Sequence, residues 1–112
     1  MSLLREFALA LPEAEERETW GHATFRIRNK LFAMMAADEA TASVKAVPEE
    51  QAACIGSDPE TFYMPPYVGK HGWIGIVLER IDRDELAELV TEAWRMTAPK
   101  RVLKAFDEAN PV

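Results

Sequence analysis

Residues 24–36 constrain the fold more than any other stretch, because they contain two strand patterns joined by a tight turn. The first run alternates polar with apolar side chains: Thr24, Phe25, Arg26, Ile27 and Arg28. This period of two is typical of a strand with one buried face, and Asn29-Lys30 separates the run from the apolar residues 31–35. The segment therefore predicts a β-hairpin in which Arg26 and Arg28 share the face opposite the core.

The tripeptide Trp20-Gly21-His22 comes directly before this hairpin. Glycine adopts backbone conformations that residues with a Cβ resist, so Gly21 permits a turn that aims the bulky Trp20 sideways or inward. We therefore expect Trp20, like Phe25 and Trp73, to anchor the core or a loop.

The first half of the chain predicts one helix before the hairpin and one strand after it. Apolar residues at helical spacing indicate a helix that Ser2 caps and Pro12 ends, followed by a short acidic connector. A turn at residues 38–41 precedes a third strand at 42–47, in which Val44 and Ala46 share one face. These strands would form a three-strand antiparallel meander.

The second half predicts helices on both sides of one further strand. Pro48 begins a short helix that Gly56 stops, and residues 62–73 form an aromatic-rich loop because they hold two prolines and two glycines. Residues 73–78 are largely apolar on both faces, which indicates a central strand. A long helix begins at Asp82, Ala98-Pro99 interrupts it, and residues 100–109 form a short last helix. The fold class is therefore α+β, an N-terminal helix, a three-strand meander and a later central strand.

Composition limits the chain to one compact domain over residues 1–112, with 48% hydrophobic residues and no apolar run long enough for a membrane helix. The N-terminus carries charge too early for a signal peptide, so a cytoplasmic location is expected. The lone Cys54 cannot form an intramolecular disulfide, and helix packing is its expected role.

The net charge of −6 argues against nucleic-acid binding over the whole surface, but the charges are unevenly distributed. Net positive segments at residues 20–47, 61–80 and 99–112 alternate with acidic segments at 1–19, 48–60 and 81–98. This pattern fits a polarised molecule with basic sheet segments and acidic helices, and it also fits an ordinary mixed surface.

Several short motifs, in this order and spacing, together resemble the MmcQ/YjbR family. They are Leu11-Pro12, the segment 18–26 (ETWGHATFR), Lys30-Leu31-Phe32-Ala33, Ser43-Val44-Lys45, Pro65-Pro66-Tyr67, Gly72-Trp73 and the helix from Asp82. The resemblance implies a CyaY-like fold, in which helices pack on one side of an antiparallel sheet. It also implies DNA binding through a double-wing motif, with the hairpins as the wings. This functional implication is an analogy at the level of the fold.

The residues give DNA binding a physical basis of their own. Four cations are expected to share the open sheet face: Arg26, Arg28, Lys30 and Lys45, with Lys70 and His71 in the nearby loop. Arginine binds phosphate bidentately, and Tyr67 and Trp73 offer stacking on unpaired bases. The alternative is that these cations are solvated and paired with neighbouring acids.

A second hypothesis is a small-ligand or protein-interaction module with an aromatic cleft. Its expected lining is Trp20, His22, Tyr67, Lys70, His71 and Trp73. No nucleophile motif surrounds Cys54, and His22 and His71 have no partner at metal-ligand spacing, so we expect no enzyme activity, no cofactor and no zinc site. The resemblance to the CyaY-like fold also implies iron binding by acidic residues as a further alternative, for which Glu13, Glu15, Glu16 and Glu18 are available. The expected partners are therefore DNA, or else a small ligand or protein, and no membrane.

Overall fold

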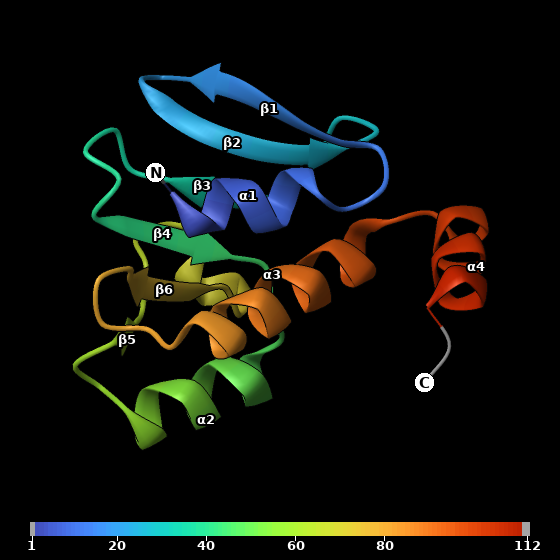
Figure 1. Cartoon of the computed structure of the whole chain (residues 1–112). Helices are drawn as coiled ribbons and strands as arrows, with labels where there is room; N and C mark the ends of the chain where they lie inside the picture. Colours follow the sequence, from blue (N-terminus) through green and yellow to red (C-terminus); the bar gives the residue numbers. More distant parts are fainter. Residues whose placement is uncertain (1, 111–112) are drawn as a thin grey trace.

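A computed structural model describes residues 2–110 as a six-stranded antiparallel sheet with helices on one face and at its edges (Figure 1). The elements are α1 (Leu3–Leu9), β1 (Ala14–Thr19), β2 (His22–Ile27), β3 (Lys30–Met35), β4 (Thr41–Val44), α2 (Pro48–Ser57), β5 (Phe62–Tyr63), the 3-10 helix η1 (Gly69–His71), β6 (Ile74–Val77), α3 (Arg83–Thr97) and α4 (Lys100–Ala109). The predicted α+β class is confirmed. No helix among residues 2–110 is both long and apolar enough to cross a membrane.

The strand order is β1-β2-β3-β4-β6-β5, so the first four strands form a continuous meander. The register places four buried residues side by side across β2, β3, β4 and β6: Phe25, Ala33, Val44 and Ile74. The helices α1 and α3 contact each other, and α3 also contacts β3 and β4, so the core lies between this face and the two helices. The helix α2 contacts the edge strand β5.

Two tight turns define the first hairpins. The β1–β2 turn has φ of +54° at Trp20 and +79° at Gly21, and the β2–β3 turn has φ of +48° at Arg28 and +67° at Asn29. Two-residue loops with positive φ at both positions match the right-handed twist of the flanking strands, which is why hairpins favour them. The second turn therefore lies one residue earlier than the sequence predicts, and Arg28 is not part of the strand.

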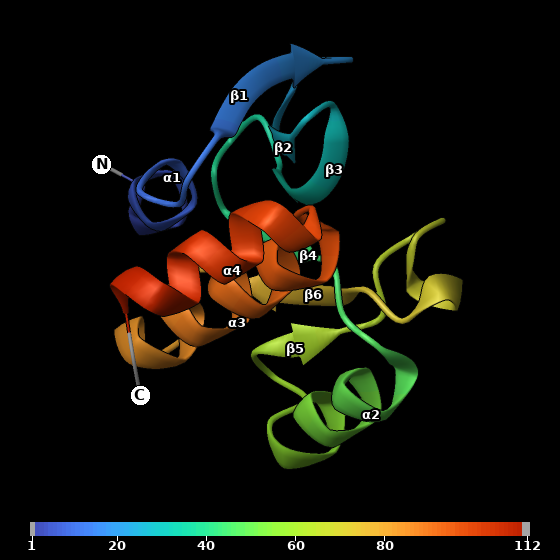
Figure 2. The same ribbon diagram turned by 90° about the vertical axis from the view of Figure 1, so that its right-hand side faces the viewer.

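The antiparallel register fixes which loops share an end of the sheet. One end, which we name the α4 end, carries the β2–β3 turn, the β4–α2 connection and the loop at residues 64–73. The opposite end, named the Trp20 end, carries the β1–β2 turn and the β3–β4 connection. Figure 2 faces the α4 end and shows α4 in front of α3.

The predicted acidic connector is wrong, because residues 14–19 pair with β2 along their whole length as β1. This edge strand escapes pattern recognition because it buries little: Ala14 and Thr19 are half-buried and the four residues between them are exposed. Charged edge strands of this kind also resist pairing with other chains. The predicted strand at 73–78 is confirmed as β6, which pairs with β4 and β5 and is internal to the sheet.

Candidate nucleic-acid interface at one end of the sheet

The cations that were predicted to share one open sheet face lie in different parts of the structure. Only Arg26 lies within a strand on that face, where it extends over Thr24. Its guanidinium donates to Thr24 Oγ1 at 3.3 Å, to Thr19 Oγ1 at 3.5 Å and to the Asn29 carbonyl at 3.5 Å. Arg26 is thus held along the β1–β2 hairpin by neutral acceptors.

Arg28 and Lys30 lie at the α4 end, in and beside the β2–β3 turn. Arg28 donates two hydrogen bonds to Glu13, with Nε–Oε1 at 2.9 Å and Nη2–Oε2 at 3.2 Å. These bonds lower the pKa of Glu13 below its usual value, so this carboxylate stays ionised. No ion pair involves Lys30 within the part of the chain that the structure describes.

Lys45 directly follows β4, which ends at Val44, and its backbone amide still donates to the Phe32 carbonyl of β3 at 2.9 Å. It lines a hollow of about 410 Å³ between α2 and α3 that also contains Glu50, Glu88 and Glu92. The rest of this lining is Ala46, Val47, Leu89 and Met96. Three carboxylates beside one ammonium group make this hollow repulsive to phosphate.

Lys70 and His71 are in η1, within the loop that follows β5. The buried Gln51 of α2 holds this loop, because its side-chain amide donates to the carbonyls of Gly69 at 2.8 Å and Trp73 at 2.6 Å. Tyr67 is 91% exposed in the same loop, at φ of +65°. These residues share the α4 end with Lys30. The first turn of α2 lies there too and adds two negative charges, Glu49 and Glu50.

The aromatic cleft predicted from the sequence does not form as one site. Trp20 and His22 lie at the Trp20 end on the β1–β2 edge, whereas Tyr67 and His71 lie at the α4 end beside β5 and β6. Trp73 is buried, with 8% of its surface exposed, which confirms a core role for it. Trp20 is 94% exposed, so the expectation of a core or loop anchor is wrong for this residue.

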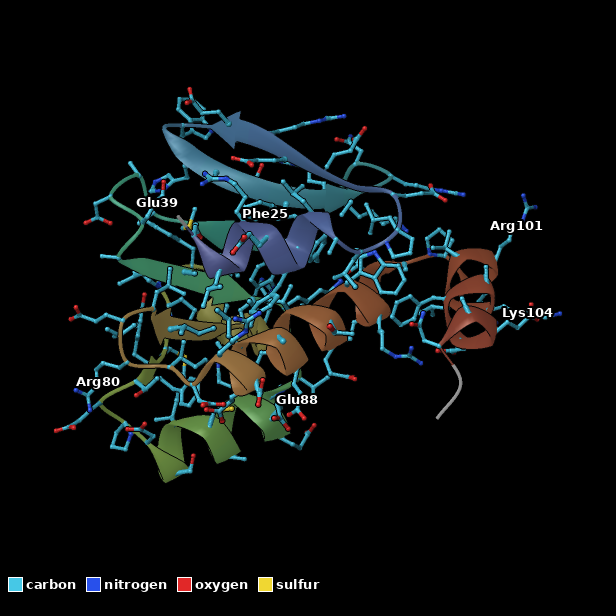
Figure 3. The ribbon with its side chains drawn as sticks, in the orientation of Figure 1. Phe25, Glu39, Arg80, Glu88, Arg101 and Lys104 are labelled. Carbon is cyan, nitrogen blue, oxygen red and sulfur yellow. The ribbon has the colours of Figure 1, made fainter. Side chains whose placement is uncertain are left out.

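Sequence reasoning did not select the cations of α4 as site residues. Arg28 and Arg101 line one hollow of about 320 Å³, which we name the α4 hollow. Its other lining residues are Pro12, Glu13, Val102, Ala105, Phe106, Ala109 and Asn110. Figure 3 shows Arg101 and Lys104 projecting from α4 at the end of the molecule opposite Glu39. The signal in the sequence was the net positive segment 99–112.

Contacts with α3 fix the walls of the α4 hollow. The indole Nε1 of Trp94 donates to the Pro12 carbonyl at 3.0 Å, and the ring of Phe106 packs on Trp94 at 4.9 Å between centroids. Arg95 donates two hydrogen bonds to Asp107, at 2.7 and 3.3 Å. The hollow is therefore preformed, with an apolar floor and two arginines on its rim.

The other candidate groups, Cys54 and the acidic residues 13–18, are not placed to react or to bind a metal ion. Burial raises the pKa of the Cys54 thiol to about 11, and Glu50 and Glu85 add to the effect, so the thiol stays protonated near neutral pH. Three of the four carboxylates at residues 13–18 are paired with arginines: Glu13 with Arg28, Glu15 with Arg17 and Glu16 with Arg5. Among residues 2–110, no three His, Cys, Asp or Glu side chains are placed to share a metal ion.

Comparison with known proteins identifies the family. The YjbR family model matches residues 9–96, which is most of the chain. The chain belongs to the YjbR family. The match of this YjbR domain ends before α4, so the helix that contributes Arg101 and Lys104 lies outside the matched residues.

Relatives and solved structures extend this result to the fold. This YjbR domain is 35% identical over 54 residues to uncharacterized proteins of Mycobacterium tuberculosis and Mycobacterium bovis. The matched stretch is 48% of this chain and spans 42% of the length of those relatives. A crystal structure of a Deinococcus radiodurans protein with a DUF419 domain superimposes with a TM-score of 0.78 at 20% identity, covering 95% of this chain and 83% of that one. It is similar in fold.

Proposed function

We propose that this YjbR domain binds nucleic acid through its α4 end, without catalysing a reaction. The observation that carries the proposal is the meeting of cations from two distant segments around the α4 hollow. Arg28 and Arg101 line the hollow, and each has a second cation close by in the chain: Lys30 at the start of β3 and Lys104 on α4. Within residues 2–110, Lys30, Arg101 and Lys104 have no carboxylate in ion-pair contact.

The net charge of −6 does not exclude this function, because phosphate responds to the local surface. The Debye length is about 8 Å at physiological ionic strength, so acidic groups at the Trp20 end are screened from a strand bound at the α4 end. Glu49 and Glu50 also lie at the α4 end, on α2, which contacts the edge strand β5. Glu13 is the carboxylate that lines the α4 hollow, and its charge is offset by Arg28. The β2–β3 hairpin is then the wing that contacts the backbone.

Fluorescence anisotropy of labelled duplex and single-stranded DNA tests the proposal. Four phosphate contacts predict a slope of log K against log salt of about −3.6 for duplex and about −2.8 for single strands. The double variant Arg101→Ala with Lys104→Ala is expected to reduce the magnitude of this slope by about half. The matched control, Arg80→Ala with Arg83→Ala, removes the same charge elsewhere and leaves the slope unchanged. Absence of saturable binding at about 100 µM protein in low salt refutes the proposal.

A second candidate function is protein recognition through the Trp20 end. Trp20 is 94% exposed and adopts a φ of +54°, a conformation that costs a residue with a Cβ about 1–2 kcal/mol. Tryptophan, with tyrosine and arginine, is enriched among the residues that contribute most binding energy in protein interfaces. Glu16, Glu18 and Glu39 line a hollow of about 270 Å³ beside Gly21, together with Arg5, which pairs with Glu16 and Glu39. Among residues 2–110 no ion pair involves Glu18, so the fitting partner is a protein with an apolar slot for Trp20 and a basic residue beside it.

Variants separate the two functions. Trp20→Ala is expected to abolish co-purification of such a protein and to leave DNA anisotropy unchanged, whereas Arg101→Ala with Lys104→Ala does the reverse. Equal loss of both properties in Trp20→Ala, with an unchanged melting temperature, contradicts the assignment of two separate surfaces.

A further inference from the structure

We infer that the α4 hollow accepts one unpaired nucleobase, so that the nucleic acid bound at this end is single-stranded. This inference rests on the proposed function and specifies its ligand. It is carried by the combination of an apolar floor, an aromatic ring and two rim arginines in one preformed hollow.

The size and lining of the hollow suit a base. At about 320 Å³ it lies at the lower limit of small-molecule sites, which run from ~300 to ~1,000 Å³ and are mostly apolar. Pro12, Val102, Ala105 and Ala109 provide the apolar surface. A stacked base pair in a duplex cannot enter such a hollow, because its faces are covered by the neighbouring pairs.

Phe106 is the stacking surface. Its ring lines the hollow and is half-buried, and the tilted packing on Trp94 at 4.9 Å holds it in place. Base stacking on aromatic rings tolerates any sequence, since every base presents a π-face. The ordered ring therefore favours binding without strong sequence preference.

The two arginines beside the hollow can bind the phosphates on either side of a base that occupies it. Arg28 uses Nε and Nη2 for Glu13, which leaves its Nη1 for a phosphate, and Arg101 is exposed on the other side of the hollow. Asn110 donates its amide to the Phe106 carbonyl at 2.9 Å, and the Oδ1 of Asn110 remains as an acceptor for a base edge. Glu13 opposes the phosphate, so Glu13→Gln is expected to increase affinity severalfold while retaining a hydrogen-bonding partner for Arg28.

The test uses an oligothymidine of about 12 nucleotides with one central 2-aminopurine, and a duplex of the same length. The single strand is expected to bind about tenfold more tightly than the duplex, and 2-aminopurine fluorescence to be quenched on stacking. Ala105→Leu with Ala109→Leu fills the hollow from two exposed helix positions, which removes the quenching and the preference but keeps salt-dependent binding. Ala52→Leu with Ala53→Leu, both exposed on α2, is the matched control and changes neither property.

The outcomes separate this inference from the proposed function. Salt-dependent binding with equal affinity for both DNAs, unaffected by the filling variant, overturns the base site and leaves the phosphate interface intact. Loss of binding to every DNA tested overturns both. Phe106→Leu keeps apolar volume and removes the ring, so quenching that persists in this variant contradicts the stacking role even if the hollow is occupied.

Discussion

Replacing Trp20 by asparagine is expected to stabilise the protein, although it removes the largest side chain type. Trp20 occupies the first position of a turn with positive φ at both residues, and Asn-Gly is the sequence that such turns favour. The relief of a strained φ contributes about 1 kcal/mol. Because Trp20 is 94% exposed, the lost burial amounts to about 0.4 kcal/mol at most.

The net gain is therefore about 0.5–1 kcal/mol in the free energy of unfolding, equivalent to a rise in Tm of roughly 2–6 °C. Urea unfolding followed by far-UV circular dichroism measures it. Gly21→Ala is the matched control: an added Cβ there has nothing within 4 Å, so the φ of +79° alone should cost about 1 kcal/mol.

A Trp20→Asn variant that is less stable than the parent by more than 1 kcal/mol refutes this reasoning, because it would mean that the indole packs on the fold. If the variant is more stable, Trp20 lowers stability in the isolated chain. A residue that lowers stability and is almost fully exposed fits a role in recognition better than a role in folding.

Three further predictions concern the interior. Gln51→Leu leaves the buried carbonyls of Gly69 and Trp73 without their side-chain donor, so the free energy of unfolding should fall by about 2–3 kcal/mol; an unchanged urea midpoint contradicts this. Gly75→Ala puts a Cβ about 2.5 Å from the Tyr63 ring and should cost about 1–3 kcal/mol, most of it recovered when Tyr63→Ala is added, as thermal melts would show. The Cys54 thiol has a pKa of about 11 in the folded chain and 9.0 ordinarily, so the unfolded chain loses this proton at lower pH than the folded chain does. The free energy of unfolding should therefore fall as pH rises from 9 to 11. Cys54→Ala should lack this pH-dependent loss when unfolding is measured across the same range.

The meander and the long helix could be predicted from the sequence because each has a repeating apolar pattern. Phe25, Ile27 and Val44 are buried at the expected strand positions, and Asp82 caps α3 by accepting hydrogen bonds from the amides of Asp84 and Glu85. The strand β1 was not predictable in this way, because an edge strand of charged residues is stabilised by its partner's backbone rather than by burial.

The candidate site was less predictable, because it depends on where strands end and on how a distant helix docks. A shift of one residue in the β2–β3 turn moved Arg28 from the sheet face to the turn, where it meets Glu13 and α4. Likewise, the sequence gives no sign that Lys45 shares a hollow with Glu88 and Glu92 of α3. Only the tertiary fold brings such residues together.

The hydrogen bond from Trp94 Nε1 to the Pro12 carbonyl joins residues 82 positions apart. During synthesis, β1 to β4 can pair as each strand emerges, because each neighbours the next in the sheet. The helix α1 precedes them all, yet its contacts are mainly with α3, so its buried Leu4 and Ala8 have no cover until α3 has been made. The cover that α3 provides for α1 therefore forms only after all six strands of the sheet have been made.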